Sequence, residues 1–358
     1  MWVFYVLLLV PIFIQHFKVR NKTNDYWKKN ERALFFFFML LFVLVAFRHE
    51  HIGSDTLNYI RYFRNRSIMS WGEVGKASSE FGFSYFIKFV SLFTKSYQLF
   101  FVAVIAVTLS VIYPTYKRLC KDTTLMIVIF CIMPTFVMAF SGIRQMIAVG
   151  IGFIAYEFTR KKKIIPFILM VLLAMTFHTS AFMLIFMYPL YHAKITKKWL
   201  YVVIPILALI FAFNRQIFLT LSVLLEMFTE YDTSITETGA YSMLILFALF
   251  AVFSFIIPDE SRLDKETMGL RNFLLLALVL QMFAPLHTIA MRMNYYYIIF
   301  IPLLIPKIID AKSDRMAQVA VVARHIMVVF FLVYFFYNAY TGDNNLHVFP
   351  YHFFWEAV

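Results

Sequence analysis

Charged side chains are scarce in this sequence. Only 15% of its 358 residues are Asp, Glu, Lys or Arg, whereas 62% are hydrophobic. A soluble globular domain carries about 25% charged residues, so the composition excludes that class. Cysteine is rarer still: Cys120 and Cys131 form neither a ligand cluster nor a paired motif, and both are expected to be inert thiols.

Several catalytic motifs are also absent. The sequence has no Asp-x-Asp pair for a metal-held nucleotide sugar, no His-Glu-x-x-His, no glycine loop for phosphates and no serine elbow. Catalysis that depends on a metal or a nucleotide is therefore not expected, and no metal site and no cofactor are predicted. No internal repeat or linker divides the chain, so residues 1–358 are predicted to form a single transmembrane domain.

Apolar sequence of membrane-spanning length is abundant. A hydrocarbon core of ~30 Å needs about 20 helical residues per span, and open strand edges cannot exist in lipid. The sequence therefore predicts an all-α polytopic membrane protein with about twelve spans. The first segment lacks a basic start and a small-residue cleavage site, so it is interpreted as a retained span. The predicted spans are 2–17, 33–47, 97–116, 123–140, 143–158, 164–177, 180–192, 199–214, 241–257, 272–287, 294–309 and 319–339.

The basic residues predict how the chain is threaded. With both termini outside, the inner loops hold 23 of the 33 Lys and Arg residues, as the positive-inside rule requires. The net charge of +13 then reflects this bias, and no nucleic-acid surface is expected. This arrangement of the chain requires that residues 81–93 do not cross the membrane. They are therefore predicted to form a re-entrant segment or to lie on the membrane surface. The outer material is predicted at about 48–96, 215–240 and 341–358.

Three arginines from distant parts of the sequence are expected on the outer side. They are Arg48 after the second span, Arg144 in SGIRQMIAVGI and Arg292 in HTIAMRMNYYY. A guanidinium holds phosphate oxygens with two parallel hydrogen bonds, so three of them together favour a diphosphate site. The alternative is that each arginine reaches the headgroup layer and fixes the end of a helix.

Three residues are candidate proton acceptors. His178 lies in the hinge FHTSA between two short helices, where an imidazole could take a proton from an attacking hydroxyl; the alternative is a histidine that satisfies carbonyls at a helix break. Asp55 is the second candidate, although Ser54 could cap the following helix and Asp55 could complement its dipole. Glu80 in SSEFGF is the third, as a base or as an acceptor from a sugar hydroxyl. Arg61 is expected on the solvated face of the helix after Asp55, facing headgroups or substrate phosphate.

Polar and apolar elements follow one another in a recognisable order. Residues 48–63 read RHEHIGSDTLNYIRYF, residues 78–83 read SSEFGF, residues 141–158 read SGIRQMIAVGIGFIAYEF and residues 161–181 read KKKIIPFILMVLLAMTFHTSA. The set resembles the EpsG/Wzy family of polysaccharide repeat-unit polymerases: its Arg, Gly-x-Asp and x-Tyr signature, its Glu-x-Gly-Phe element, its Arg-x-x-Ile-Ala helix and its Phe-His-x-Ser-Ala hinge. The resemblance covers about residues 33–190, and beyond it only MRMNYYYIIFIPLLI is similar.

The resemblance implies a GT-C-like multi-span glycosyltransferase in the bacterial inner membrane, with its active site on the outer side. Its substrates would be oligosaccharides carried by undecaprenyl diphosphate, and a chain-length regulator and a flippase are further expected partners. In that setting His178, Asp55 or Glu80 would be the base and Arg48, Arg144 and Arg292 would hold the diphosphate. Tyr59 and Arg61 are predicted to contact the substrate.

Two other classes stay open at the level of the sequence. A ligase or acyltransferase of the same membrane type would also gather outer arginines and a histidine, and only its product, a single transfer, would distinguish it. A flippase for the same lipid-linked sugar should show repeated halves and polar residues deep in a central cavity. The sequence shows neither feature.

Overall fold

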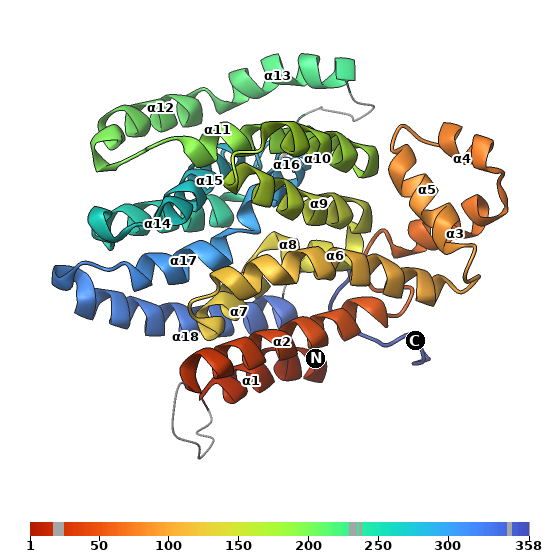
Figure 1. Ribbon diagram of the computed structural model, residues 1–358, viewed down its shortest axis with the longest axis horizontal. Helices are drawn as coiled ribbons and strands as arrows, with labels where there is room; N and C mark the ends of the chain where they lie inside the picture. The colour runs from red at the N-terminus through yellow and green to blue at the C-terminus, as the bar shows by residue number, and fades with distance from the viewer. Residues whose placement is uncertain (17–24, 229–234, 236–237, 342–345, 358) are drawn as a thin grey trace.

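A computed structural model describes residues 1–16, 25–228, 235, 238–341 and 346–357. Within these residues the chain is helical, and its only extended pairings are two isolated bridges, Arg48 with Phe353 and Pro258 with Lys312. Figure 1 shows that most of the long helices run roughly along the long axis of the molecule, in layers stacked across it. They are α1 (Trp2–His16), α2 (Asp25–Ala46), α3 (Thr56–Ile68), α4 (Trp71–Lys76), α5 (Phe81–Val90), α6 (Tyr97–Leu119), α7 (Thr123–Ile132), α8 (Pro134–Ser141), α9 (Ile143–Arg160), α10 (Ile164–Phe177), η1 (Thr179–Phe186), α11 (Met187–His192), η2 (Lys197–Trp199), α12 (Leu200–Ala212), α13 (Asn214–Phe228), α14 (Tyr241–Ile256), η3 (Glu260–Arg262), α15 (Lys265–Gln281), α16 (Thr288–Ile298), α17 (Ile301–Asp310), η4 (Asp314–Met316) and α18 (Ala317–Thr341).

Several helices are long and apolar enough to cross a membrane. Among the described residues there are two, α6 and the segment 314–341, or up to five if each bent helix pair is one span. The bent pairs are α7 with α8 at 65°, residues 179–192 with 197–212 at 118°, and α16 with α17 at 46°. Each of the twelve predicted spans coincides with a helix or with such a broken segment. The protein is thus a helical membrane protein, and the twelve-span, GT-C-like arrangement remains a prediction.

Ion pairs join the basic turns at one end of the bundle. Arg118, at the end of α6, pairs with Glu157 of α9 at 2.6 Å and with Glu266 of α15 at 2.7 Å. The Nε2 atom of His192 lies 3.1 Å from the carbonyl oxygen of Thr159. The count of basic residues predicts that these turns lie on the same side of the membrane. The contacts show that the turns are neighbours in the structure, which agrees with that prediction.

The opposite end carries the small helices α3, α4 and α5, which lie together at the right of Figure 1. The C-terminal residues 346–357 pack here against the loop after α2. His49 N–H donates to the carbonyl of His352 at 2.9 Å, and Gly53 N–H donates to that of His347 at 3.2 Å. The loop after the second helix and the C-terminal segment therefore form one layer.

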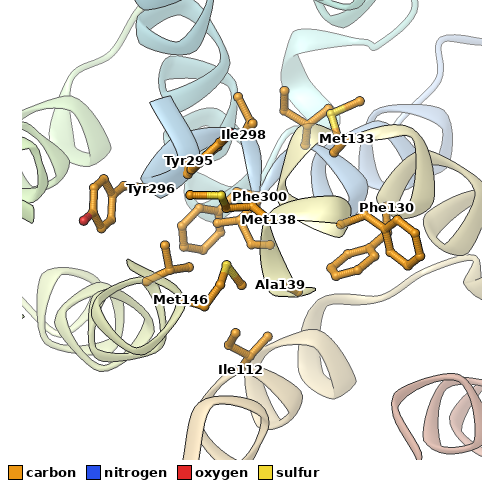
Figure 2. Packing of buried hydrophobic residues seen from close by; sticks show 14 of the residues in the cluster. Ile112, Phe130, Met133, Met138, Ala139, Met146, Tyr295, Tyr296, Ile298 and Phe300 are labelled. Carbon is orange, nitrogen blue, oxygen red and sulfur yellow. The ribbon is translucent and has the colours of Figure 1, made fainter. Parts of the chain in front are cut away.

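A helix break at Pro134 lies at the centre of the bundle. Proline cannot donate a backbone hydrogen bond, and it holds the preceding Met133 extended, with φ −72° and ψ 143°. As a result α7 ends and α8 begins in a new direction. Figure 2 shows Met133, at the break, and Met138, in α8, and both line the same cavity as Tyr295. The break leaves room for the cavity described below.

Two predictions on outer segments need revision or remain open. The predicted outer loop 215–240 contains helix α13, because the stretch NRQIFLTLSVLLEMF continues a helical pattern; residues 229–234 and 236–237 lie outside the described residues. Residues 81–93 form α5 and a turn, which bury Phe83 and Ile87 and expose Phe89 and Phe93. That two-faced helix is compatible with a surface position, which stays a prediction.

Candidate functional site

A cavity of about 420 Å³ lies between the α7–α8 break, α16 and α18. Its size falls in the range of ~300–1,000 Å³ that is typical of ligand pockets. Its polar wall contains Ser54, Asp55, Ser141, Thr288, Arg292, Tyr295, Tyr334 and Asn338, and its apolar wall includes Met133, Met138, Leu346 and Phe349. Segments from the beginning, the middle and the end of the chain thus build one site.

Among the described residues, Asp55 and Arg292 are the two charged residues in this lining. Neither the carboxylate of Asp55 nor the guanidinium of Arg292 has a hydrogen-bond or ion-pair partner among the described residues. Both residues are partly exposed, so water can solvate their charges until a ligand replaces it. Two unpaired groups of opposite sign in one cavity are therefore available to a ligand that carries both a donor and an anionic group.

A tight turn places Asp55 in the cavity. Gly53 has φ +87°, and a Cβ at this position would lie 2.3 Å from the carbonyl oxygen of Phe140, so only glycine fits. Ser54 Oγ lies 2.8 Å from Ser141 Oγ, and Asp55 N–H donates to the same oxygen at 3.3 Å. Asp55, rather than Ser54, is the N-cap of α3, and its side chain makes no capping bond. The alternative in which Ser54 caps this helix is therefore wrong, because the Ser54 hydroxyl contacts Ser141 of α8.

Beside the cavity, Glu80 holds together three polar groups from distant segments. Its carboxylate accepts hydrogen bonds from the Arg144 guanidinium at 2.5 Å and from Thr179 N–H at 3.1 Å. One carboxylate oxygen also lies 2.6 Å from His178 Nδ1. Burial raises the pKa of Glu80, but the hydrogen bond and charge of His178, with the charge of Arg144, outweigh burial and lower it overall. Glu80 therefore remains a carboxylate, and His178 is held in a fixed orientation.

Two further side chains connect this cluster to the cavity. Gln145 Nε2 donates to the carbonyl oxygen of Arg292 at 2.5 Å and to Ser180 Oγ at 3.3 Å. The guanidinium carbon of Arg144 lies 5.9 Å from the centre of the ring of buried Tyr59, and burial raises the pKa of Tyr59, so its hydroxyl stays protonated. The positions of Arg292 and of the Glu80 cluster are thus coupled through α9.

Arg48 lies behind the cavity rather than in its wall. It is 1% exposed, donates to the Val45 carbonyl and to Thr56 Oγ1, and lies 4.1 Å above the ring of Phe101. Burial lowers the pKa of Arg48 to about 10, which still leaves it charged at neutral pH. Of the three predicted arginines, Arg48, Arg144 and Arg292, only Arg292 is in the lining of the cavity.

The remaining predicted residues have different surroundings. Arg61 is exposed on α3, as expected for the solvated face of that helix, and Tyr59 is buried. Sequence reasoning missed Gln145, Ser141 and the tail residues Leu346 and Phe349, because no motif marks them. The described residues contain no group of three or more His, Cys, Asp and Glu that could hold a metal ion. Cys120 and Cys131 are buried and free, as predicted.

The architecture and this site define a helical membrane protein with a polar cavity at a helix break. The chain belongs to the EpsG family, whose model matches residues 31–353. The resemblance found in the motifs is thereby confirmed over nearly the whole chain. No curated protein and no solved structure matched the chain. Membership in the family indicates a glycosyltransferase-like polymerase that acts in polysaccharide biosynthesis at a membrane.

Replacing Glu80 with glutamine is expected to lower the free energy of unfolding by about 2 kcal/mol, because it removes the buried carboxylate that pairs with Arg144 and contacts His178 and Thr179 N–H. Since the folded-state pKa of Glu80 is lowered, its contribution is present above its ordinary pKa and is lost as the pH falls through the folded value. Thermal unfolding of wild type and variant, followed by fluorescence between about pH 7 and pH 3, measures both effects. Equal unfolding temperatures at neutral pH would contradict the prediction.

Proposed function

We propose that this protein polymerises oligosaccharide repeat units, as a Wzy-type enzyme does. It would transfer a growing glycan from undecaprenyl diphosphate to a lipid-linked repeat unit at the outer face of the bacterial inner membrane. The observation that carries the proposal is the pair of unpartnered charges, Asp55 and Arg292, in one cavity of an EpsG-family protein. A base and a cation are the two groups that displacement of a diphosphate requires.

The reaction is a single displacement at the anomeric carbon. The acceptor hydroxyl forms a bond to that carbon while the bond to the diphosphate oxygen breaks, and the configuration inverts. Asp55 takes the proton of the hydroxyl, and Arg292 balances the charge that develops on the departing diphosphate. The leaving group is already a good one, so the site supplies charge stabilisation and needs no proton donor for it.

Glu80, Arg144 and His178 act as positioning residues in this proposal. The carboxylate of Glu80 is occupied by three donors, which leaves it poorly suited to accept a further proton. His178 contacts Glu80 through Nδ1, which leaves its Nε2 atom to accept a proton from a substrate. His178 is therefore the second candidate base. Arg48 and Arg144 support the cavity from behind, and Tyr59 orients Arg144.

The test uses purified protein in lipid nanodiscs with its lipid-linked repeat unit. We expect a ladder of products that differ by one repeat unit, together with release of undecaprenyl diphosphate. A single transfer to a different acceptor would instead define a ligase, and transport of intact substrate without new glycosidic bonds would define a flippase. Either result would overturn the proposal. A chain-length regulator and a flippase are proposed as partners in the membrane.

A further inference from the structure

A second cavity, almost entirely apolar, lies on the other side of α16. Its volume is about 710 Å³, and helices α10 with η1, α15 and α16 form its inner walls. The inner walls are buried, as shown by Met183, Phe283 and Ile289. The outer side is covered by α12 and α13, through Ile210, Ile217, Phe218 and Leu221. Thr179 is the only residue of its lining with a polar side chain.

Helix α16 separates this apolar cavity from the polar one. Thr288, Met291, Arg292 and Tyr295 line the polar cavity, whereas Ile289, Ala290 and Met293 line the apolar cavity. Because an α-helix with its side chains is about 10 Å across, a ligand in the apolar cavity lies within about that distance of Arg292. Thr179, which lines the apolar cavity, also donates its N–H to Glu80. The two cavities therefore belong to one site.

Helix α12 is less buried than α13, which buries Phe218 and Ser222. No residue of α12 is buried, although every position of this helix is described. A further apolar cavity of about 580 Å³ lies between α12, α14 and α15, and Leu207 and Phe211 of α12 line it on the side next to Ile210. The two apolar cavities thus lie under neighbouring positions of α12.

We propose that the apolar cavity beneath α12 and α13 holds the isoprenoid chain of the lipid-linked substrate, next to the diphosphate at Arg292. This inference rests on the proposed function and adds the site of the lipid. Lipid tails are as apolar as the cavity lining, so the chain gains little by leaving the bilayer. The cavity instead fixes the direction of the chain, which aligns the diphosphate with Arg292. Met175, Met183 and Met293 are flexible enough to adapt to a methyl-branched chain.

The first experiment maps the lipid in the unmodified protein. Undecaprenyl diphosphate with a photoreactive diazirine in its first isoprene units is incorporated into nanodiscs with the purified protein and irradiated. We expect labelled peptides from residues 175–186, 210–221 and 276–293. Unlabelled undecaprenyl diphosphate should suppress the labelling, and the same amount of phosphatidylglycerol should not. Equal suppression by both lipids, or labelling only of other peptides, would overturn the proposal.

The second experiment fills the cavity from its cover. Leu221→Trp places an indole in the apolar cavity. Leu219→Trp is the matched control, because Leu219 lies on the same helix and does not line the cavity. The exposed fractions of the two leucines are similar, 48% for Leu219 and 45% for Leu221. Overpacking should weaken labelling by the prenyl probe about tenfold in L221W and leave L219W at the wild-type level. Equal labelling of all three proteins contradicts the proposal.

The outcomes separate this inference from the proposed function. Prenyl-selective labelling of these peptides in a protein that makes no polymer would retain the lipid site and remove the polymerase assignment. Polymerisation without prenyl-selective labelling would retain the assignment and remove the lipid site. The mapping in the unmodified protein decides the matter even if L221W fails to fold.

Discussion

Replacing Asp55 with asparagine is expected to slow glycan transfer by about 10²–10⁴-fold, the usual contribution of a general base. Asparagine keeps the size of the side chain but accepts no proton at neutral pH. Because the carboxylate of Asp55 has no partner in the described structure, its loss breaks no ion pair, and the protein should remain folded. The rate of polymer formation and the unfolding temperature, measured on the same preparation, check both statements.

A matched carboxylate at the other end of the bundle serves as the control. Asp314 pairs with Arg262 and is 88% exposed, so Asp314→Asn should change neither rate nor stability measurably. If Asp55→Asn retained its activity while His178→Gln lost it, His178 would be the base. The proposed division between a catalytic Asp55 and a positioning Glu80–His178 pair would then be wrong.

Replacing Arg292 with alanine is expected to reduce the turnover number by about 10²–10³-fold, the cost of removing one group that stabilises developing negative charge. Arg292→Lys should recover only part of this loss, since an ammonium group cannot hold two phosphate oxygens in parallel. Inorganic pyrophosphate should inhibit the wild type and should inhibit the alanine variant much less. Steady-state kinetics with and without pyrophosphate measures all three effects.

An exposed arginine of α3 is the control for Arg292. Arg64 is exposed and does not line the cavity, so Arg64→Ala should keep its turnover number and its inhibition by pyrophosphate. Equal loss of activity in the two variants would mean that the protein acts through its overall positive charge. Unchanged kinetics in Arg292→Ala would remove the anion site from the cavity.

The helices could be predicted from the sequence because apolar runs and basic turns carry that information directly. The hinge at His178 is confirmed: α10 ends at Phe177, His178 is extended and η1 follows. The same reasoning missed α13, since the segment after Asn214 mixes polar and apolar residues as a loop would. The positions of the apolar helices thus follow from composition, whereas the extent of the less apolar helices depends on packing.

The site was only partly predictable, because its contacts join residues far apart in the chain. Glu80, Arg144 and His178 were each candidates, but nothing in their spacing shows that one carboxylate holds the other two side chains. Arg48 shows the converse problem. Its position after a span fits a phosphate ligand and a buried support equally well, and the direction of its side chain is set by Thr56 and Phe101.

The C-terminal segment has a consequence for biosynthesis. Leu346 and Phe349 complete the cavity wall, and the segment binds the loop at Gly53 that emerges from the ribosome early in translation. The loop around Gly53 therefore lacks these hydrogen-bond partners until the chain after α18 has been synthesised. A chain that stops after α18 would keep its helices and lack a finished cavity. The enzyme is thus expected to become competent only after residues 346–357 have been synthesised, when α18 and the helices before it have already been made.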